Sequence, residues 1–316
     1  MRITLWPGAG PRRSSTQARP QGGSRSRSGA RPLLSAGWLA AAVTPLTFLG
    51  HGPTTSAADA GGRAEVPRIA SRSESTPPNG NSPALEDPVA KAKRMIGECQ
   101  ARFVKVRDYT CTFVKRERVG GKLAPLHVMH MKARNNPTSI YFKFQRPNKG
   151  REAIYVAGKH GGKVLAHDVG IGRLLAGTMN LDPRGSMAME NSRHPITEAG
   201  IGVLIETIAE RWAVELTPEE SKVVFNPNMT IGPHRCTLIE SVHPVRKPHF
   251  LFHKVRLFVD REHGLPIRFE AYDWPRSPGA APELVEEYSY LDLKTNVGLV
   301  DHDFDPENKA YSFGRF

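Results

Sequence analysis

Cysteine is scarce in this chain, and the familiar catalytic signatures are missing. The 316 residues include three cysteines, which form neither a C-x-x-C pair nor a zinc-finger spacing. This scarcity disfavours a redox dithiol and a structural zinc module. The chain also lacks a G-x-S-x-G elbow and a G-x-x-x-x-G-K-[ST] loop, so serine-hydrolase and phosphate-loop chemistry are not indicated.

Acidic residues are absent from the first 32 positions, which contain seven arginines. An uncharged run at 33–50 follows, and small residues surround Ala58. A basic front, an apolar middle and a small-x-small end are typical of an export signal. We therefore expect residues 1–58 to be cleaved after Ala58, or after Ala60, so that the mature chain is periplasmic or secreted. The alternative is an uncleaved anchor in the inner membrane, which the short run and its Pro45 disfavour.

The positive charge is concentrated in this leader. The net charge is +13 for the whole chain, and +6 remains without the seven arginines. No basic stripe with interleaved aromatic residues is present, so we expect no nucleic-acid partner. A mildly positive surface is compatible with transient contact with an anionic membrane surface.

The three cysteines leave two interpretations open. In an oxidising compartment, one bridge and one free thiol are expected. Cys111 and Cys236 are then the preferred pair, because both lie in strand patterns. Alternatively, both are buried thiols together with Cys99, and all three act as small hydrophobic residues.

The folded part of the chain is expected to begin at Asp87. Residues 59–86 are rich in Ser, Pro, Gly and Ala and predict a disordered linker. Residues 87–316 predict one domain. Asp87 and Pro88 are typical of the cap and first position of a helix, and apolar residues at helical spacing then predict an amphipathic helix of about five turns.

Short alternating patterns predict two sets of antiparallel strands. The first set covers 109–117, 126–132, 139–145, 152–157 and 163–167, and the second covers 222–225, 235–242, 254–260, 266–272 and 284–293. Between the sets lies an insert at about 170–216, in which 195–212 predicts a second helix. The expected fold class is α+β: a strongly curved antiparallel half-barrel with an N-terminal helix and a helical lid insert.

Candidates for polar chemistry are weak. His243, His249 and His253 fall within one stretch, but no carboxylate accompanies them at ligand spacing. We therefore expect no metal ion and no cofactor. Glu286 and Glu287 point to opposite faces of a strand, which makes them a poor catalytic dyad. We expect no catalytic residue and no enzyme activity.

Several sequence blocks together resemble an exported bacterial family of unknown function, DUF1571. The blocks are Tyr109–Glu117, Gly150–Val156, Leu181–Met189, His194–Gly202, Arg268–Pro275 and Glu286–Leu299. The resemblance covers about 93–306 and implies no assigned chemistry. The order of elements is also similar to that of the periplasmic lipoprotein carriers of the LolA and LolB type, which implies a half-barrel whose helical insert covers its apolar concave face.

The leading functional hypothesis is non-catalytic binding of a lipid, a lipoprotein acyl chain or another apolar ligand in the periplasm. The physical reason is that a half-barrel under a methionine-bearing lid offers an apolar concavity. Candidate ligand-binding residues are Phe142, Phe144, Ile154, Val156, Met187, Met189, Ile201, Leu204 and Ile205. The second hypothesis is an envelope interaction or sensor protein that binds a protein partner, and the third is a secreted hydrolase. Sequence alone does not decide which face of the sheet points inward.

Overall fold

The computed structural model describes residues 86–169 and 177–313. The expected export signal and its apolar run at 33–50 lie outside these residues. So do residues 59–85 of the expected linker and residues 170–176, the first part of the insert. No helix in the described part of the chain is both long enough and apolar enough to cross a membrane.

Helix α1 spans Pro88–Phe103 and begins where the sequence predicts. The Asp87 side chain accepts a hydrogen bond from the Ala90 backbone N at 2.8 Å, and Pro88 occupies the first turn. This satisfies one of the backbone N–H groups that a helix start leaves without a partner. The apolar stripe that includes Ile96 and Cys99 is buried, as helical spacing predicts.

The described strands form one antiparallel sheet. Its elements are β1 Asp108–Val119, β2 Lys122–Leu123, β3 His127–Asn135, β4 Thr138–Arg146, β5 Glu152–Val156, β6 Val164–His167, β7 Thr178–Leu181, β8 Lys222–Ile231, β9 His234–Val242, β10 Lys254–Asp260, β11 Pro266–Asp273 and β12 Glu283–Thr295. The order across the sheet is β7-β6-β5-β4-β3-β1-β12-β11-β10-β9-β8, with β2 paired to β1. The strands β1 and β12 are therefore neighbours in the middle of the sheet, and β7 and β8 form its two edges.

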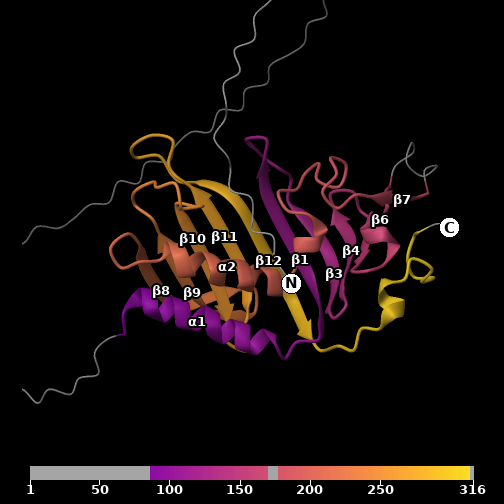
Figure 1. Ribbon diagram of the computed structural model, residues 1–316, viewed down its shortest axis with the longest axis horizontal. Coiled ribbons are helices and arrows are strands. Elements are labelled where there is room, and N and C mark those ends of the chain that lie inside the picture. Colours follow the sequence, from indigo (N-terminus) through magenta and orange to yellow (C-terminus); the bar gives the residue numbers. More distant parts are fainter. Residues whose placement is uncertain (1–85, 170–176, 314–316) are drawn as a thin grey trace, which may run out of the picture. The chain divides into compact units, whose positions relative to one another are not determined.

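The two faces of the sheet carry different partners. On β3, Met129 and Met131 belong to the large core that includes both helices, whereas Lys132 and Arg134 on the opposite face pair with Asp303 and Asp301 of the C-terminal segment. We call these the helix face and the tail face. Figure 1 shows α2, Ile201–Glu215, lying across the second strand set with α1 beside it. The predicted α+β class with a curved antiparallel sheet is confirmed.

Helix α2 begins later than the sequence predicts. Residues Ile196–Glu198 form a separate 3₁₀ turn, η2, and Gly200 precedes α2 with φ +124°. That conformation is essentially restricted to glycine, so the helical pattern cannot run through from residue 195. The buried stripe of α2 includes Ile201, Ile205 and Trp212.

A second, smaller core lies on the tail face. Tyr141, Ile154 and Val156 pack there against Phe304 and Phe313 of the C-terminal segment. This segment contains the 3₁₀ turn η3, Asp301–Phe304. Figure 1 shows it beside β4, drawn in yellow. Both faces of the first strand set are therefore covered by the chain itself.

The predicted bridge between Cys111 and Cys236 is absent from the structure, in which all three cysteines are free and buried. Cys111 lies on β1 and Cys236 on β9, with three strands between them. Neighbouring strands lie about 4.8 Å apart, whereas bridged Cα atoms lie at most about 7 Å apart. The alternative interpretation, three buried thiols, matches the structure.

Candidate functional site

The helix face of the first strand set, together with Tyr290 of the neighbouring β12, is an aromatic and methionine-rich surface. We call it the floor, and its residues are Phe113, Met129, Met131, Phe142, Phe144 and Tyr290. The ring of Phe113 lies 5.7 Å from that of Phe142 and 5.0 Å from that of Tyr290, measured between centroids. Such ring clusters bury a large apolar area and keep a defined shape.

An irregular segment docks against this half of the helix face. Residues 182–200, here called the cover, consist of turns and η2 without an α-helix or a strand. The Lys115 Nζ donates to Ser192 Oγ at 2.7 Å, and the Arg193 backbone N donates to Glu117 Oε2 at 2.9 Å. At its end, the Ile201 backbone N donates to the Tyr109 hydroxyl at 3.0 Å. The cover is therefore attached through polar contacts as well as through Ile196 and Ala199, which pack against the core.

Glu286 of β12 is the central anchor of the cover. Its side chain is fully buried, and Oε2 accepts from Arg193 Nε at 2.8 Å and lies 3.2 Å from His194 Nε2. The other carboxylate oxygen has no hydrogen-bond partner among the described residues. A buried carboxylate that is only partly satisfied contributes little net stability. Glu286 therefore fixes the position of the cover but adds little net free energy to its attachment.

Two titratable groups beside this anchor, His194 and Glu117, have shifted pKa values. Burial lowers the pKa of His194, but its hydrogen bonds to Glu198 and Glu286 outweigh burial and hold that pKa above its usual range. Burial raises the pKa of Glu117, but the Lys115 charge and the hydrogen bond from Tyr288 outweigh it and hold that pKa below its usual range. Both shifts favour the charged form of the group, the imidazolium of His194 and the carboxylate of Glu117.

The structure separates the predicted ligand-binding residues into four groups. Phe142 and Phe144 lie on the floor, and Ile201, Leu204 and Ile205 are buried on the side of α2 that faces the sheet. Met187 is 62 % exposed, and Met189 of the cover is half-buried.

Ile154 and Val156 do not belong to the same surface. Both lie in the tail-face core. The prediction that they line the same ligand-binding surface as Phe142 and Phe144 is therefore wrong. Tyr141 of β4 pairs with Ile154, and Phe142 pairs with Ala153. Because paired residues share a face and successive residues alternate, this register sends Phe142 and Ile154 to opposite sides.

A family model for a protein family of unknown function, DUF1571, matches residues 106–313, which is about two thirds of the chain. The chain belongs to the DUF1571 family. No curated protein matches it.

Solved structures with a similar arrangement have low sequence identity to this DUF1571 chain. The lipoprotein LppX of Mycobacterium tuberculosis is 9 % identical with a TM-score of 0.38, over 68 % of this chain and 98 % of that one. A LolA superfamily protein of Nitrosomonas europaea is 10 % identical with a TM-score of 0.28, over 68 % and 97 %. A chain of the Pseudomonas aeruginosa MucA/MucB complex is 12 % identical with a TM-score of 0.40, and the match covers 68 % of this chain and 61 % of that one.

The three histidines that the sequence groups together do not converge in the DUF1571 chain. His249 Nε2 lies 3.2 Å from Glu220 Oε2, and His253 Nδ1 lies 3.0 Å from the His243 backbone O. His243 itself stacks on Phe250, with ring centroids 3.9 Å apart. Each ring therefore has its own partner.

A buried serine, histidine and glutamate lie next to one another in the same region. His243 Nδ1 is 3.2 Å from Ser221 Oγ, and Nε2 is 3.7 Å from Glu215 Oε2. The Ser221 hydroxyl donates to the Glu215 backbone O at 3.2 Å, and all three side chains are buried. A hydroxyl that donates to a main-chain carbonyl is not donating to a general base, so this cluster is a satisfied polar core.

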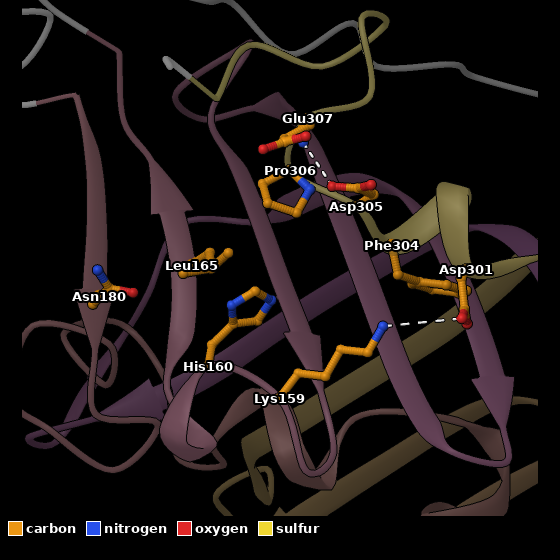
Figure 2. A pocket seen from close by; sticks show the side chains of 9 residues that line it. All are labelled: Lys159, His160, Leu165, Asn180, Asp301, Phe304, Asp305, Pro306 and Glu307. Atoms are coloured by element: carbon orange, nitrogen blue, oxygen red, sulfur yellow. Dashed lines mark hydrogen bonds and ion pairs between the residues drawn. The ribbon is translucent and has the colours of Figure 1, made fainter. Parts of the chain in front are cut away.

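A pocket of about 360 Å³ opens on the tail face (Figure 2). Its lining residues are Lys159, His160, Leu165, Asn180, Asp301, Phe304, Asp305, Pro306 and Glu307. Lys159 Nζ points toward Asp301 at 4.0 Å. Sequence reasoning missed this pocket, because the C-terminal segment reaches it only through tertiary packing. Its mixed charges suit a small polar ligand better than an acyl chain.

Stability should fall at mildly acidic pH because two buried histidines resist protonation. Burial is the main cause that lowers the pKa of His127 and of His243 to about 4. An unfolded histidine titrates near 6.5, so the unfolded chain binds more protons between these values. The stability that both groups contribute is complete above pH 6.5 and is lost as the pH falls toward 4, on the order of 2 kcal/mol each.

Urea unfolding at pH 7.0, 5.5 and 4.5 measures this loss. His127→Asn is expected to flatten the pH dependence, while His249→Asn, at a half-exposed ring, is expected to leave it unchanged. If the free energy of unfolding falls with pH as steeply in His127→Asn as in the unaltered protein, His127 is not a source of the pH dependence.

Proposed function

We propose that this protein is a non-catalytic binding protein of the cell envelope. It holds an apolar ligand, such as a lipid or a lipoprotein acyl chain, between the floor and the cover. Export through the leader, with cleavage near Ala58, places it in the periplasm or outside the cell.

The single observation that carries this proposal is the contrast between the floor and its cover. The floor is aromatic and methionine-rich, while the cover is irregular and is attached through Ser192, Arg193 and His194. Polar groups released from such an attachment regain hydrogen bonds with water, so opening costs less than it would for an apolar lid. An acyl chain that then occupies the floor restores its burial, at about 25 cal/mol per Å².

Phe144 marks the accessible end of the floor. It is half-buried and lies beside His127, with ring centroids 5.8 Å apart. Met189 of the cover is also half-buried. A flexible, polarisable methionine adapts to apolar partners of varied shape. The entry route for a chain-like ligand is therefore proposed at this end.

The ligand proposal predicts a face-specific effect on acyl-chain binding. Phe144→Gln removes apolar area from the floor at a half-buried position, and we expect it to weaken binding of a fluorescent fatty acid by about tenfold, which corresponds to 1.4 kcal/mol. The adjacent Gln145→Ala is the matched control, because Gln145 is exposed and follows on the same strand. Fluorescence titration of the full chain measures both.

Native mass spectrometry of the full chain from the producing envelope is the direct companion test. Co-purifying lipid or lipoprotein is expected. A ligand-free protein whose fatty-acid affinity is equal in Phe144→Gln and Gln145→Ala would overturn the proposal.

A protein partner is the second candidate, and the outward side of α2 favours it. Val203 and Val214 are 38 % and 66 % exposed, and their spacing places them on one stripe of the helix. Photo-crosslinking from position 214 in the producing cell tests this candidate. A defined crosslinked partner, absent when the probe is moved to the tail face, is the supporting result.

A further inference from the structure

Three side chains from two separate segments of the sequence meet at one end of β9 and β10. His234 is the first residue of β9, Asp260 is the last of β10, and His263 lies in the turn to β11. Asp260 Oδ2 is 2.6 Å from His263 Nδ1, and Oδ1 is 3.6 Å from His234 Nδ1. One ligand atom from each residue lies within 4.8 Å of the others.

We propose that His234, Asp260 and His263 bind a divalent transition-metal ion of the Zn²⁺ class. Two imidazoles and one carboxylate are a ligand set that suits zinc and related ions. The sequence contains no short motif for it. The antiparallel pairing of β9 with β10, in which Cys236 lies opposite Asp260, brings the start of β9 beside the end of β10.

The spacing of the three groups matches a coordination sphere after small rotations. Zinc bonds of about 2.0–2.2 Å place neighbouring tetrahedral ligands about 3.4 Å apart. The separation of 3.6 Å between His234 and Asp260 already has this size. The contact of 2.6 Å between His263 and Asp260 needs to open by less than 1 Å, because the ion replaces the hydrogen bond.

A turn cap alone does not account for the whole cluster. Asp260 Oδ2 accepts the His263 backbone N at 3.0 Å, which explains why an acid ends β10. His234 is not needed for that cap, and its distance to Asp260 is too long for a hydrogen bond. Its side chain nevertheless lies against the carboxylate, with 13 % exposure. Metal ligation gives all three residues a role.

The site is accessible to an ion from solvent. Its three protein ligands also leave one coordination position of the ion free. Asp260 is 1 % exposed, whereas His263 is 20 % exposed, so the site is reached from the histidine side. Cys236 pairs with Asp260 in the ladder, and its thiol donates to the His234 backbone O at 3.7 Å. Three protein ligands leave the fourth position to water.

Zinc titration of the full chain, first stripped with EDTA, tests the site. We expect one Zn²⁺ per chain with micromolar or tighter affinity, weakened at least tenfold by His234→Ala and by His263→Ala. His249→Ala is the matched control, because His249 is half-exposed and is not part of the cluster. Co²⁺ substitution is expected to give the visible absorption of a four-coordinate site only when both histidines are present.

The fold of each variant is checked by circular dichroism in EDTA, and His234→Ala keeps the turn cap of Asp260 intact. Absence of stoichiometric zinc binding would overturn the proposal, as would equal affinity in His234→Ala and His249→Ala. Fatty-acid binding by the same variants is expected to be unchanged, which separates failure of the metal site from failure of the proposed ligand site.

Discussion

Glu286→Ala is expected to release the cover while the sheet stays folded. The substitution removes the fully buried carboxylate that pairs with Arg193 and His194. Arg193 then lacks this buried counter-charge, while His194 keeps Glu198 as a partner. Breaking a buried ion pair from one side costs 3–5 kcal/mol in dry interiors. Arg193 is 32 % exposed and regains water, so we expect about 2 kcal/mol, or roughly thirtyfold in the opening equilibrium.

Hydrogen exchange of the backbone measures this opening. Protection in 192–201 should fall by that factor, while strand β10 keeps its protection. Glu283→Ala is the matched control on the same strand. Glu283 pairs with Arg276, whose side chain is 71 % exposed, and surface pairs contribute less than about 1 kcal/mol. Unchanged protection of 192–201 in Glu286→Ala would show that the anchor is not what holds the cover.

Gly200→Ala is expected to destabilise the protein by about 3 kcal/mol, through backbone strain and overpacking together. Gly200 has φ +124°, and a Cβ atom there would lie 2.8 Å from the Tyr109 hydroxyl oxygen. Tyr109 is 1 % exposed and accepts the Ile201 backbone N. The added methyl group therefore disturbs both the start of α2 and its contact with β1.

Gly97→Ala is the matched control for the same chemical change. Gly97 lies inside α1, and nothing lies within 4 Å of a Cβ atom built on it. Alanine in a helix interior gains about 0.5–1 kcal/mol over glycine. The midpoint of urea unfolding should therefore fall for Gly200→Ala and rise for Gly97→Ala. An unchanged midpoint for Gly200→Ala would contradict the close packing of Gly200 against Tyr109.

The elements were predictable because their signals are local. Asp87 and Pro88 mark a helix start in any context, and alternation in β4 identifies a strand without knowledge of its neighbours. The start of α2 was misplaced because the helical pattern continues through residues 195–200, while the backbone conformation at Gly200 follows from its close contact with Tyr109.

The site was only partly predictable because it depends on pairing between distant strands. Phe142 and Ile154 are both apolar strand residues, and only the register of β4 with β5 sends them to opposite faces. Glu286 was set aside as one of two neighbouring acids, yet its face of β12 meets Arg193. A buried acid in an otherwise apolar alternation was the signal that could have identified it.

The sequence by itself determined ten of the twelve strands that the structure describes, the first helix and membership in the DUF1571 family, since these follow from periodicity, capping and local motifs. The tertiary structure decided which face the helices cover, that the cysteines remain unbridged, how the cover is anchored at Glu286, and that His234 meets Asp260 and His263. Those features arise from contacts between residues many positions apart, and strand register fixes them only when the whole sheet has formed.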